Sequence, residues 1–182
     1  MITLIILAGN LISKMKNIII DLISKAKRDE PSYKAGMKTL SKLHNFIHFS
    51  PESEKELFAN ILKNNSDDDS IIFTFLAHGG QSGLSNNFDL RVSYVDIFNI
   101  AGTVRTRNKV IINFLANCVS EQSLKHLPAN HSIDEVWYTS QETISIDKAI
   151  RAAAGGFQNF YDLLDINEQT LYQRRELTLP TN

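Results

Sequence analysis

Cysteine is nearly absent from this sequence, with one residue, Cys118, in a chain of 182. A single cysteine excludes an internal disulfide, so the disulfide frameworks of small secreted proteins are ruled out. An excess of charge of one sign is also lacking, because 19 basic residues face 20 acidic ones. This balance gives no electrostatic reason to expect a nucleic acid or an anionic membrane as a partner.

Long apolar segments and internal repeats are missing as well. No run approaches the roughly 20 apolar residues that a helix needs to cross a bilayer. The apolar stretch from Ile2 to Leu7 has no basic residue before it, unlike a secretory signal, and we interpret it as a first core strand. The chain length and the 43% apolar content predict one soluble domain, which we expect in the cytoplasm.

Strand and helix patterns alternate along the chain. Apolar, β-branched runs predict strands at 2–8, 43–49, 71–77, 110–116 and 135–140. Helical spacing of apolar residues predicts helices at 11–28, 52–64, 94–101, after Cys118 and at 146–164, with one more short polar helix from Asp165. Residues 29–42 show no clear period and are expected to be a polar connection. The alternation predicts an α/β fold with a mostly parallel sheet of five or six strands flanked by helices.

Two of the expected strands end in residues that carry chemistry. The run SIIFTFLAHGG reaches His78 and then Gly79, and the run KVIINFLANC ends at Cys118. In open α/β sheets, function lies at the carboxyl ends of the strands. Neighbouring strands are about 4.8 Å apart, so two adjacent strand ends can share one substrate.

A histidine and a cysteine at one sheet edge suit acyl transfer. A thiolate is a strong nucleophile, and an imidazole can pass a proton to the leaving amine. The intermediate also needs N–H donors for its oxyanion. We therefore expect Cys118 as nucleophile, His78 as general acid and base, and the N–H groups of Gly79 and Cys118 as the oxyanion hole. The reaction needs no cofactor and no metal.

The order of these motifs resembles that of the caspase-like (clan CD) cysteine peptidases, and most closely the bacterial CHAT-domain group. The segment DEVWYTSQETISIDKAIRAAAGGFQNFYDLL, 134–164, is similar to the group's fifth strand and following helix, which carries a phenylalanine and a Phe-Tyr pair. The chain departs from caspases in having Ala116-Asn117-Cys118 in place of Gln-Ala-Cys. Its His78 and Cys118 are 40 residues apart, whereas caspases have about 50. Both departures argue against aspartate specificity.

The resemblance implies a caspase-like three-layer sandwich, with a peptidase domain at 1–164 and a C-terminal tail at 165–182. It also implies a specificity pocket built by the loops after strands one, four and five. In this chain the pocket positions are Asn10, Asn117, Ser140, Gln141 and Glu142, and Glu142 favours a basic side chain before the scissile bond. The implied partners are a protein or peptide substrate and a regulatory sensor protein or domain, in signalling or defence.

Other interpretations stay open. Cys118 is compatible with a buried structural cysteine, and the domain with an inactive scaffold that binds partners. The glycine-rich stretch 79–83 follows a strand but lacks the lysine and spacing of a phosphate loop, so nucleotide binding by a flavodoxin-like module ranks third. His44 and His48 have the spacing of zinc ligands on a helix, but they lie in an expected strand. His126 is expected at the surface.

Overall fold

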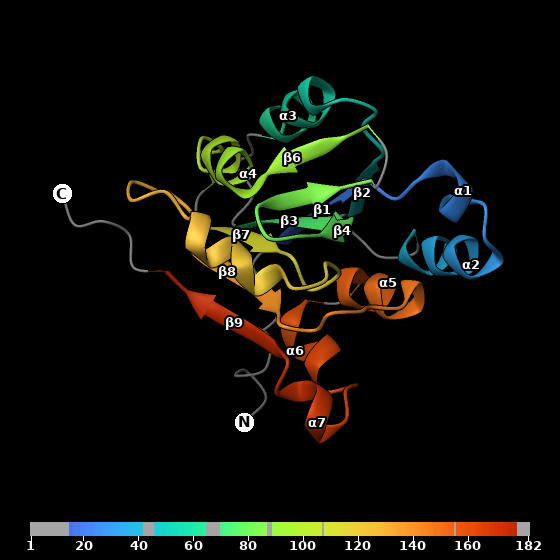
Figure 1. Ribbon diagram of the computed structural model, residues 1–182. Coiled ribbons are helices and arrows are strands. Elements are labelled where there is room, and N and C mark those ends of the chain that lie inside the picture. The colour runs from blue at the N-terminus through green and yellow to red at the C-terminus, as the bar shows by residue number, and fades with distance from the viewer. Residues whose placement is uncertain are drawn as a thin grey trace, which may run out of the picture.

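The computed structural model describes residues 15–41, 46–64, 70–86, 89–106, 108–154 and 156–177. A six-stranded sheet crosses the centre of the molecule in the order β2-β1-β3-β7-β8-β9 (Figure 1). All neighbouring pairs are parallel except β8 and β9, which are antiparallel. The strands are β1 (Met15–Asp21), β2 (Phe46–Phe49), β3 (Ser70–Leu76), β7 (Lys109–Asn113), β8 (Glu135–Thr139) and β9 (Tyr172–Glu176). The expected α/β class with a mostly parallel sheet is confirmed.

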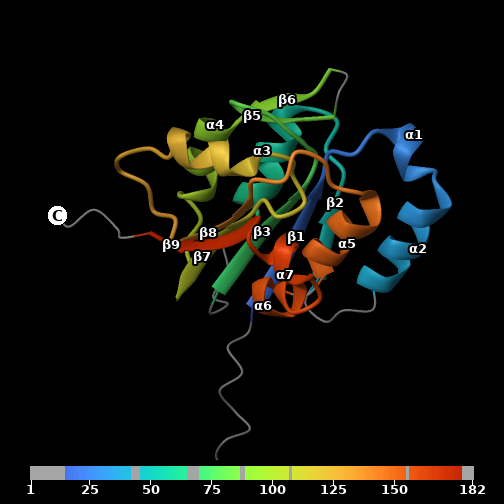
Figure 2. The same cartoon turned by 60° about the horizontal axis from the view of Figure 1, so that its bottom comes forward.

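Helices cover both faces of this sheet, so the molecule has three layers (Figure 2). One face carries α3 (Glu54–Leu62) and α4 (Tyr94–Ala101), and the other carries α2 (Pro31–Leu40), α5 (Ile146–Ala154) and α6 (Phe157–Tyr161). Successive strand residues point to opposite faces. Ile18 therefore joins the core under α3 and α4, while Ile19 joins the core under α2 and α5.

The central strand β1 corrects one expectation. Helical spacing over 11–28 predicted a helix, but residues 15–21 form β1, and only Lys25–Arg28 are helical, as α1. The reason is that β1 lies between β2 and β3 and is buried on both faces, so Ile18, Ile19 and Ile20 are all fully buried. A continuous apolar run of this kind satisfies a helical period as well as a strand. The strand expected at 2–8 lies outside the described residues.

Residues 29–42, expected to be a polar connection, contain α2 (Pro31–Leu40), so that prediction is wrong. α2 buries Tyr33 and Leu40 against the sheet and packs beside α5. The strand at 71–77, the helix at 94–101 and the strand at 135–140 are confirmed within one residue. Strand 43–49 is confirmed from Phe46 onward, and helix 52–64 as α3.

The C-terminal part differs from expectation in two places. The helix expected at 146–164 is interrupted at Gly156, whose φ of 77° lies in the left-handed region, and it becomes α5 and α6. The short polar helix expected from Asp165 is present as α7 (Ile166–Gln169). The chain then adds β9 to the sheet edge, a strand that the sequence pattern did not predict. Within the described ranges, no helix is both long enough and apolar enough to cross a membrane.

Candidate active site

Strands β3 and β7 are parallel neighbours, so both chains leave the sheet at the same edge. After β3, the chain bends at Ala77 and forms β4 (His78–Gly79), the first strand of a small antiparallel sheet with β5 (Gly83–Ser85) and β6 (Arg91–Ser93). β7 ends at Asn113, earlier than the predicted end at Ala116, and residues 114–119 turn above the edge. His78 and Cys118 thus belong to two adjacent strand extensions, as the sequence indicated.

Gly79 lies directly against the main chain of Cys118. A Cβ atom added at Gly79 would be 2.0 Å from the Cys118 carbonyl oxygen and 3.0 Å from the Cys118 nitrogen. Real Cβ atoms do not approach backbone so closely, so glycine is needed here because it has no side chain. His78 directly precedes Gly79 and is therefore one residue along the chain from this contact.

Asn117 fastens the cysteine turn to the end of β3. Its side chain is fully buried, and its Nδ2 donates to the carbonyl oxygens of Phe75 at 3.1 Å and of Ala77 at 3.0 Å. The prediction that Asn117 lines a substrate pocket does not agree with this burial. Instead, its hydrogen bonds tie Asn117, the residue before Cys118, to Ala77, the residue before His78, and thereby set the distance between the two segments.

Val119, directly after the cysteine, has a strained backbone. Its φ of 45° and ψ of 31° are left-handed, a conformation that costs a β-branched residue about 1–3 kcal/mol. The Val119 N–H donates to the carbonyl oxygen of Gln141 at 2.9 Å, which holds the turn in place. The 3₁₀-helix η1 (Ser120–His126) follows at once. This turn leaves Cys118 half-buried, although the residues before it are buried.

The backbone N–H groups of Gly79 and Cys118 are not used in the hydrogen bonds around the contact. Gly80 N–H donates to the Gly83 carbonyl oxygen at 3.0 Å, and Gly79 lies opposite Leu84 in the β4–β5 ladder. Bonded and non-bonded pairs alternate in such a ladder, so the Gly79 N–H points away from β5. Cys118 N–H has no acceptor in the part of the chain that the structure describes. Both groups are able to hold an oxyanion.

His78 is half-buried, and its environment favours the neutral imidazole. Burial lowers the pKa of His78, and the positive charge of Lys27 on α1 lowers the pKa further. Lys27 itself pairs with Glu30 at 2.7 Å on the exposed face of α1. A neutral His78 near pH 7 can accept the proton of a neighbouring thiol.

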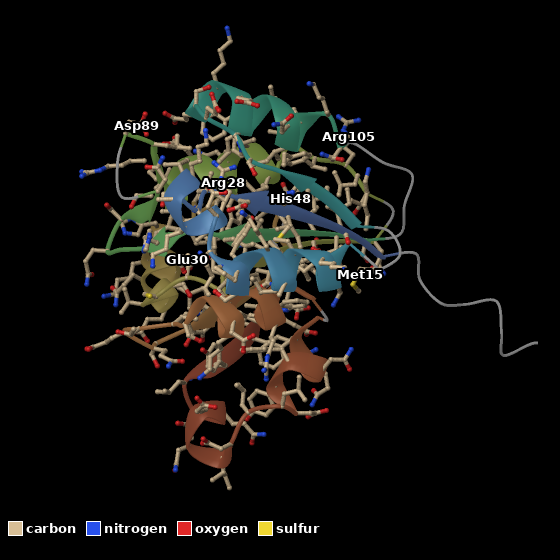
Figure 3. The ribbon with its side chains drawn as sticks, turned by 90° about the vertical axis from the view of Figure 1, so that its right-hand side faces the viewer. Met15, Arg28, Glu30, His48, Asp89 and Arg105 are labelled. Carbon is tan, nitrogen blue, oxygen red and sulfur yellow. The ribbon has the colours of Figure 1, made fainter. Side chains whose placement is uncertain are left out.

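Two concavities lie at the carboxyl edge of the sheet, and His78 lines one of them. A concavity of about 410 Å³ is lined by His78, Gly79 and Gly80 and by residues of β5 and β6, but not by Cys118. The second concavity, of about 770 Å³, is lined by residues that follow β1, by α1 and by Asn86 and Asp89, on the face shown in Figure 3 with Arg28 and Asp89 labelled. A bound chain therefore has room on the His78 side of the contact.

The other predicted specificity residues lie in different environments. Asn10 lies outside the described residues. Ser140 donates its N–H to Leu171, and the side-chain oxygen of Gln141 accepts from the Tyr172 hydroxyl. Glu142 is exposed. Of the three predicted residues after β8, Glu142 is thus the one that is exposed.

Sequence reasoning missed two residues of this region, Tyr94 and His126. Tyr94 is fully buried and donates its N–H to the Ser82 carbonyl oxygen at 3.0 Å. His126, expected at the surface, places its Nε2 2.9 Å from the Gln81 carbonyl oxygen. Both hold the β4–β5 turn above the cysteine. No sequence signal marks them, because the contacts join segments more than ten residues apart.

A metal site has little support from the residues in view. His48 pairs with the buried carboxylate of Asp21, with Nε2 and Oδ2 3.3 Å apart, and Tyr33 also donates to this carboxylate. His44 lies outside the described residues. Among the residues that are described, no group of three or more histidine, cysteine, aspartate or glutamate side chains is placed to hold a metal ion.

Comparison with known proteins adds no assignment. No family model matches the chain, and no curated protein matches it significantly. The geometry at the carboxyl edge of the sheet is therefore the basis for assigning a function.

Proposed function

We propose that the chain is a cysteine endopeptidase of the caspase-like type, similar to the CHAT group, with Cys118 as nucleophile and His78 as general acid and base. The observation that carries the proposal is the contact of Gly79 with the Cys118 main chain. It brings a half-buried cysteine, a neutral histidine and two available N–H groups to one sheet edge. The strained turn at Val119 adds support, because such strain is concentrated at functional sites.

The proposed reaction passes through a thioester. Neutral His78 takes the proton of the Cys118 thiol, and the sulfur attacks the peptide carbonyl carbon. The oxyanion is held by the N–H groups of Gly79 and Cys118. When the C–N bond breaks, His78 returns the proton to the leaving amine. A water molecule, deprotonated by His78, then attacks the thioester, the C–S bond breaks, and the peptide acid and the thiol are released.

The substrate is proposed to be a peptide segment of a protein. Glu142 is exposed next to the cysteine turn and favours a basic side chain before the scissile bond. Ser140 and Gln141 use their N–H groups within the protein, so an added peptide strand would pair with Glu142 and Thr143 rather than with the whole segment. A reduced thiol suits the cytoplasm, where we place the protein. A sensor protein or domain is the proposed regulator.

The second candidate is an inactive caspase-like scaffold. In the described part of the chain, no hydrogen bond joins His78 to Cys118, which is compatible with a domain that binds without cleaving. The same arrangement is compatible with an enzyme, because catalytic hydrogen bonds often tighten only when substrate binds.

Mutation of the two residues tests the function directly. Cys118→Ala and His78→Ala should each abolish cleavage of a fluorogenic peptide library, and the double variant should match Cys118→Ala, because the imidazole has no acyl-enzyme to serve without the thiol. His131→Ala is the matched control, since His131 contacts the Ile133 carbonyl oxygen before β8 and should keep full activity. Turnover that survives in Cys118→Ala excludes cysteine catalysis. No product from the wild type, with partner binding intact in Cys118→Ala, favours the scaffold.

A further inference from the structure

The Tyr94 hydroxyl is buried and has no hydrogen-bond partner among the residues that the structure describes. Tyr94 is the first residue of α4, its N–H is bonded to Ser82, and its ring packs edge-on against Phe114 with the centroids 5.2 Å apart. The centroid of the His126 ring lies 6.0 Å from that of Tyr94. These contacts hold the phenol in one position. A polar group left unpaired in a rigid, dry setting is costly, and it calls for an explanation.

Within the described ranges, the neighbours of this hydroxyl include a donor but no acceptor. The Gly80 N–H lies close enough to lower the pKa of Tyr94, but its hydrogen bond goes to the Gly83 carbonyl oxygen. An ionised Cys118 has the opposite effect and raises the pKa of Tyr94, so the sulfur lies within electrostatic range of the phenol. Burial makes the largest contribution and keeps the phenol protonated. Gly80, whose N–H lies near the phenol, directly follows Gly79, which packs against the Cys118 main chain. The Tyr94 O–H is therefore an unused donor next to the segment that contacts the cysteine turn.

We propose that Tyr94 donates its O–H to the ionised sulfur of Cys118 and stabilises the thiolate form of the nucleophile. This inference rests on the proposed function, because it assigns a partner to the nucleophile. A neutral thiol is a weak acceptor, whereas a thiolate forms a strong, charge-assisted hydrogen bond. Cys118 is half-buried, and the proposed hydrogen bond requires its side chain to turn toward the phenol when the thiol ionises.

Other titratable groups surround the cysteine and must be separated from Tyr94. His78 on β4 directly precedes Gly79, which contacts Cys118, and Lys27 of α1 lies within electrostatic range of His78. Tyr172 on β9 also lies within electrostatic range of Cys118, next to Glu168. The hydroxyl of Tyr172, however, donates to the side-chain oxygen of Gln141. Tyr172→Phe is therefore a matched control: it removes a hydroxyl near the cysteine that already has an acceptor.

The test is the pH dependence of Cys118 alkylation by iodoacetamide, which reports one site because the chain has one cysteine. Loss of a hydrogen bond to a charged acceptor should raise the titration midpoint in Tyr94→Phe by about one to two pH units. Tyr172→Phe should keep the wild-type midpoint. Tyr94→Phe retains the ring and removes only an unpaired hydroxyl, so the thermal midpoint of the protein should not fall.

A second substitution guards against an indirect packing effect. Replacement of Tyr94 by 3-fluorotyrosine makes the phenol a stronger donor and should lower the midpoint, the opposite direction to Tyr94→Phe. If Cys118 is reactive and its alkylation midpoint is the same in the wild type, Tyr94→Phe and the 3-fluorotyrosine protein, the role of Tyr94 is overturned and the peptidase proposal stands. A Cys118 that the reagent fails to modify at any pH in the folded wild type overturns both, because the nucleophile is then inaccessible.

Discussion

A methyl group at residue 79 tests the contact on which the proposed site depends. In Gly79→Ala the new Cβ would lie 2.0 Å from the Cys118 carbonyl oxygen, whereas real Cβ contacts are essentially never under 3.0 Å. The two segments must therefore separate by about 1 Å or distort locally. Gly79 does not have a positive φ, so alanine introduces no backbone strain of its own and the effect is a collision.

Two magnitudes follow from this separation. Forcing an extra carbon into a packed site costs about 1–3 kcal/mol of the free energy of unfolding. A misplacement of about 1 Å between catalytic groups can cost about 100-fold in rate. Because the displaced residues include the oxyanion donor and the nucleophile, we expect kcat/KM to fall by at least this factor. The loss of activity should therefore exceed what the loss of stability explains.

Gly80→Ala is the matched control one residue away. The nearest atom to a Cβ at residue 80 is the Gly83 carbonyl oxygen at 3.6 Å, an ordinary van der Waals contact. Urea denaturation gives the stability of both variants, and peptide turnover together with Cys118 alkylation gives their reactivity. Equal stability and equal reactivity of the two variants would refute the close approach of residue 79 to Cys118, and with it the geometry of the dyad.

Two further substitutions address the electrostatics and the clamp of the site. Lys27→Glu should raise the pKa of His78, because a nearby positive charge that disfavours the imidazolium is removed. The NMR titration of His78 and the acid limb of the pH–rate profile should both move to higher pH, whereas the control Lys34→Glu on α2 should change neither. An unmoved His78 titration in Lys27→Glu would contradict the effect of Lys27 on His78. Asn117→Leu should lower the free energy of unfolding by about 1–3 kcal/mol, because the buried carbonyl groups of Phe75 and Ala77 lose their donor. A loss below about 0.5 kcal/mol in urea denaturation, which is typical of a surface substitution, would show that these two hydrogen bonds are not formed.

Local sequence patterns were sufficient to predict the strands that are short apolar runs bounded by polar residues. The runs that became β3 and β8 are short, apolar and bounded by polar residues, which distinguishes them from helices. The adjacency of the His78 and Cys118 strands followed from the alternation of strands and helices, because successive parallel strands tend to pair. The meeting of these two strand ends was thus predictable from chemistry and order alone.

Hydrophobic periodicity gave the wrong element for β1, because a strand that is buried on both faces shows no alternation of apolar and polar residues. Residues 18–20 are consecutive isoleucines because β1 is covered on both faces, and such a run is compatible with either a helix or a strand. β9 was missed for the opposite reason: it is an edge strand whose residues after Tyr172 are all exposed and polar or charged, so it shows no apolar alternation. Its pairing with β8 is decided by the partner strand rather than by its own composition.

The sequence by itself determined the residue types at the strand ends, namely a histidine with a glycine after it and a lone cysteine. Only the tertiary structure decided how they meet. The contact of Gly79 with Cys118, the clamp by Asn117 and the bond from the Tyr94 N–H to Ser82 all join segments distant in the chain. Sequence periodicity reports which side of an element is buried, but it carries no information on which distant atom lies against it. Packing sets these partners, because a buried polar atom must find its bond among whatever groups the fold brings within reach.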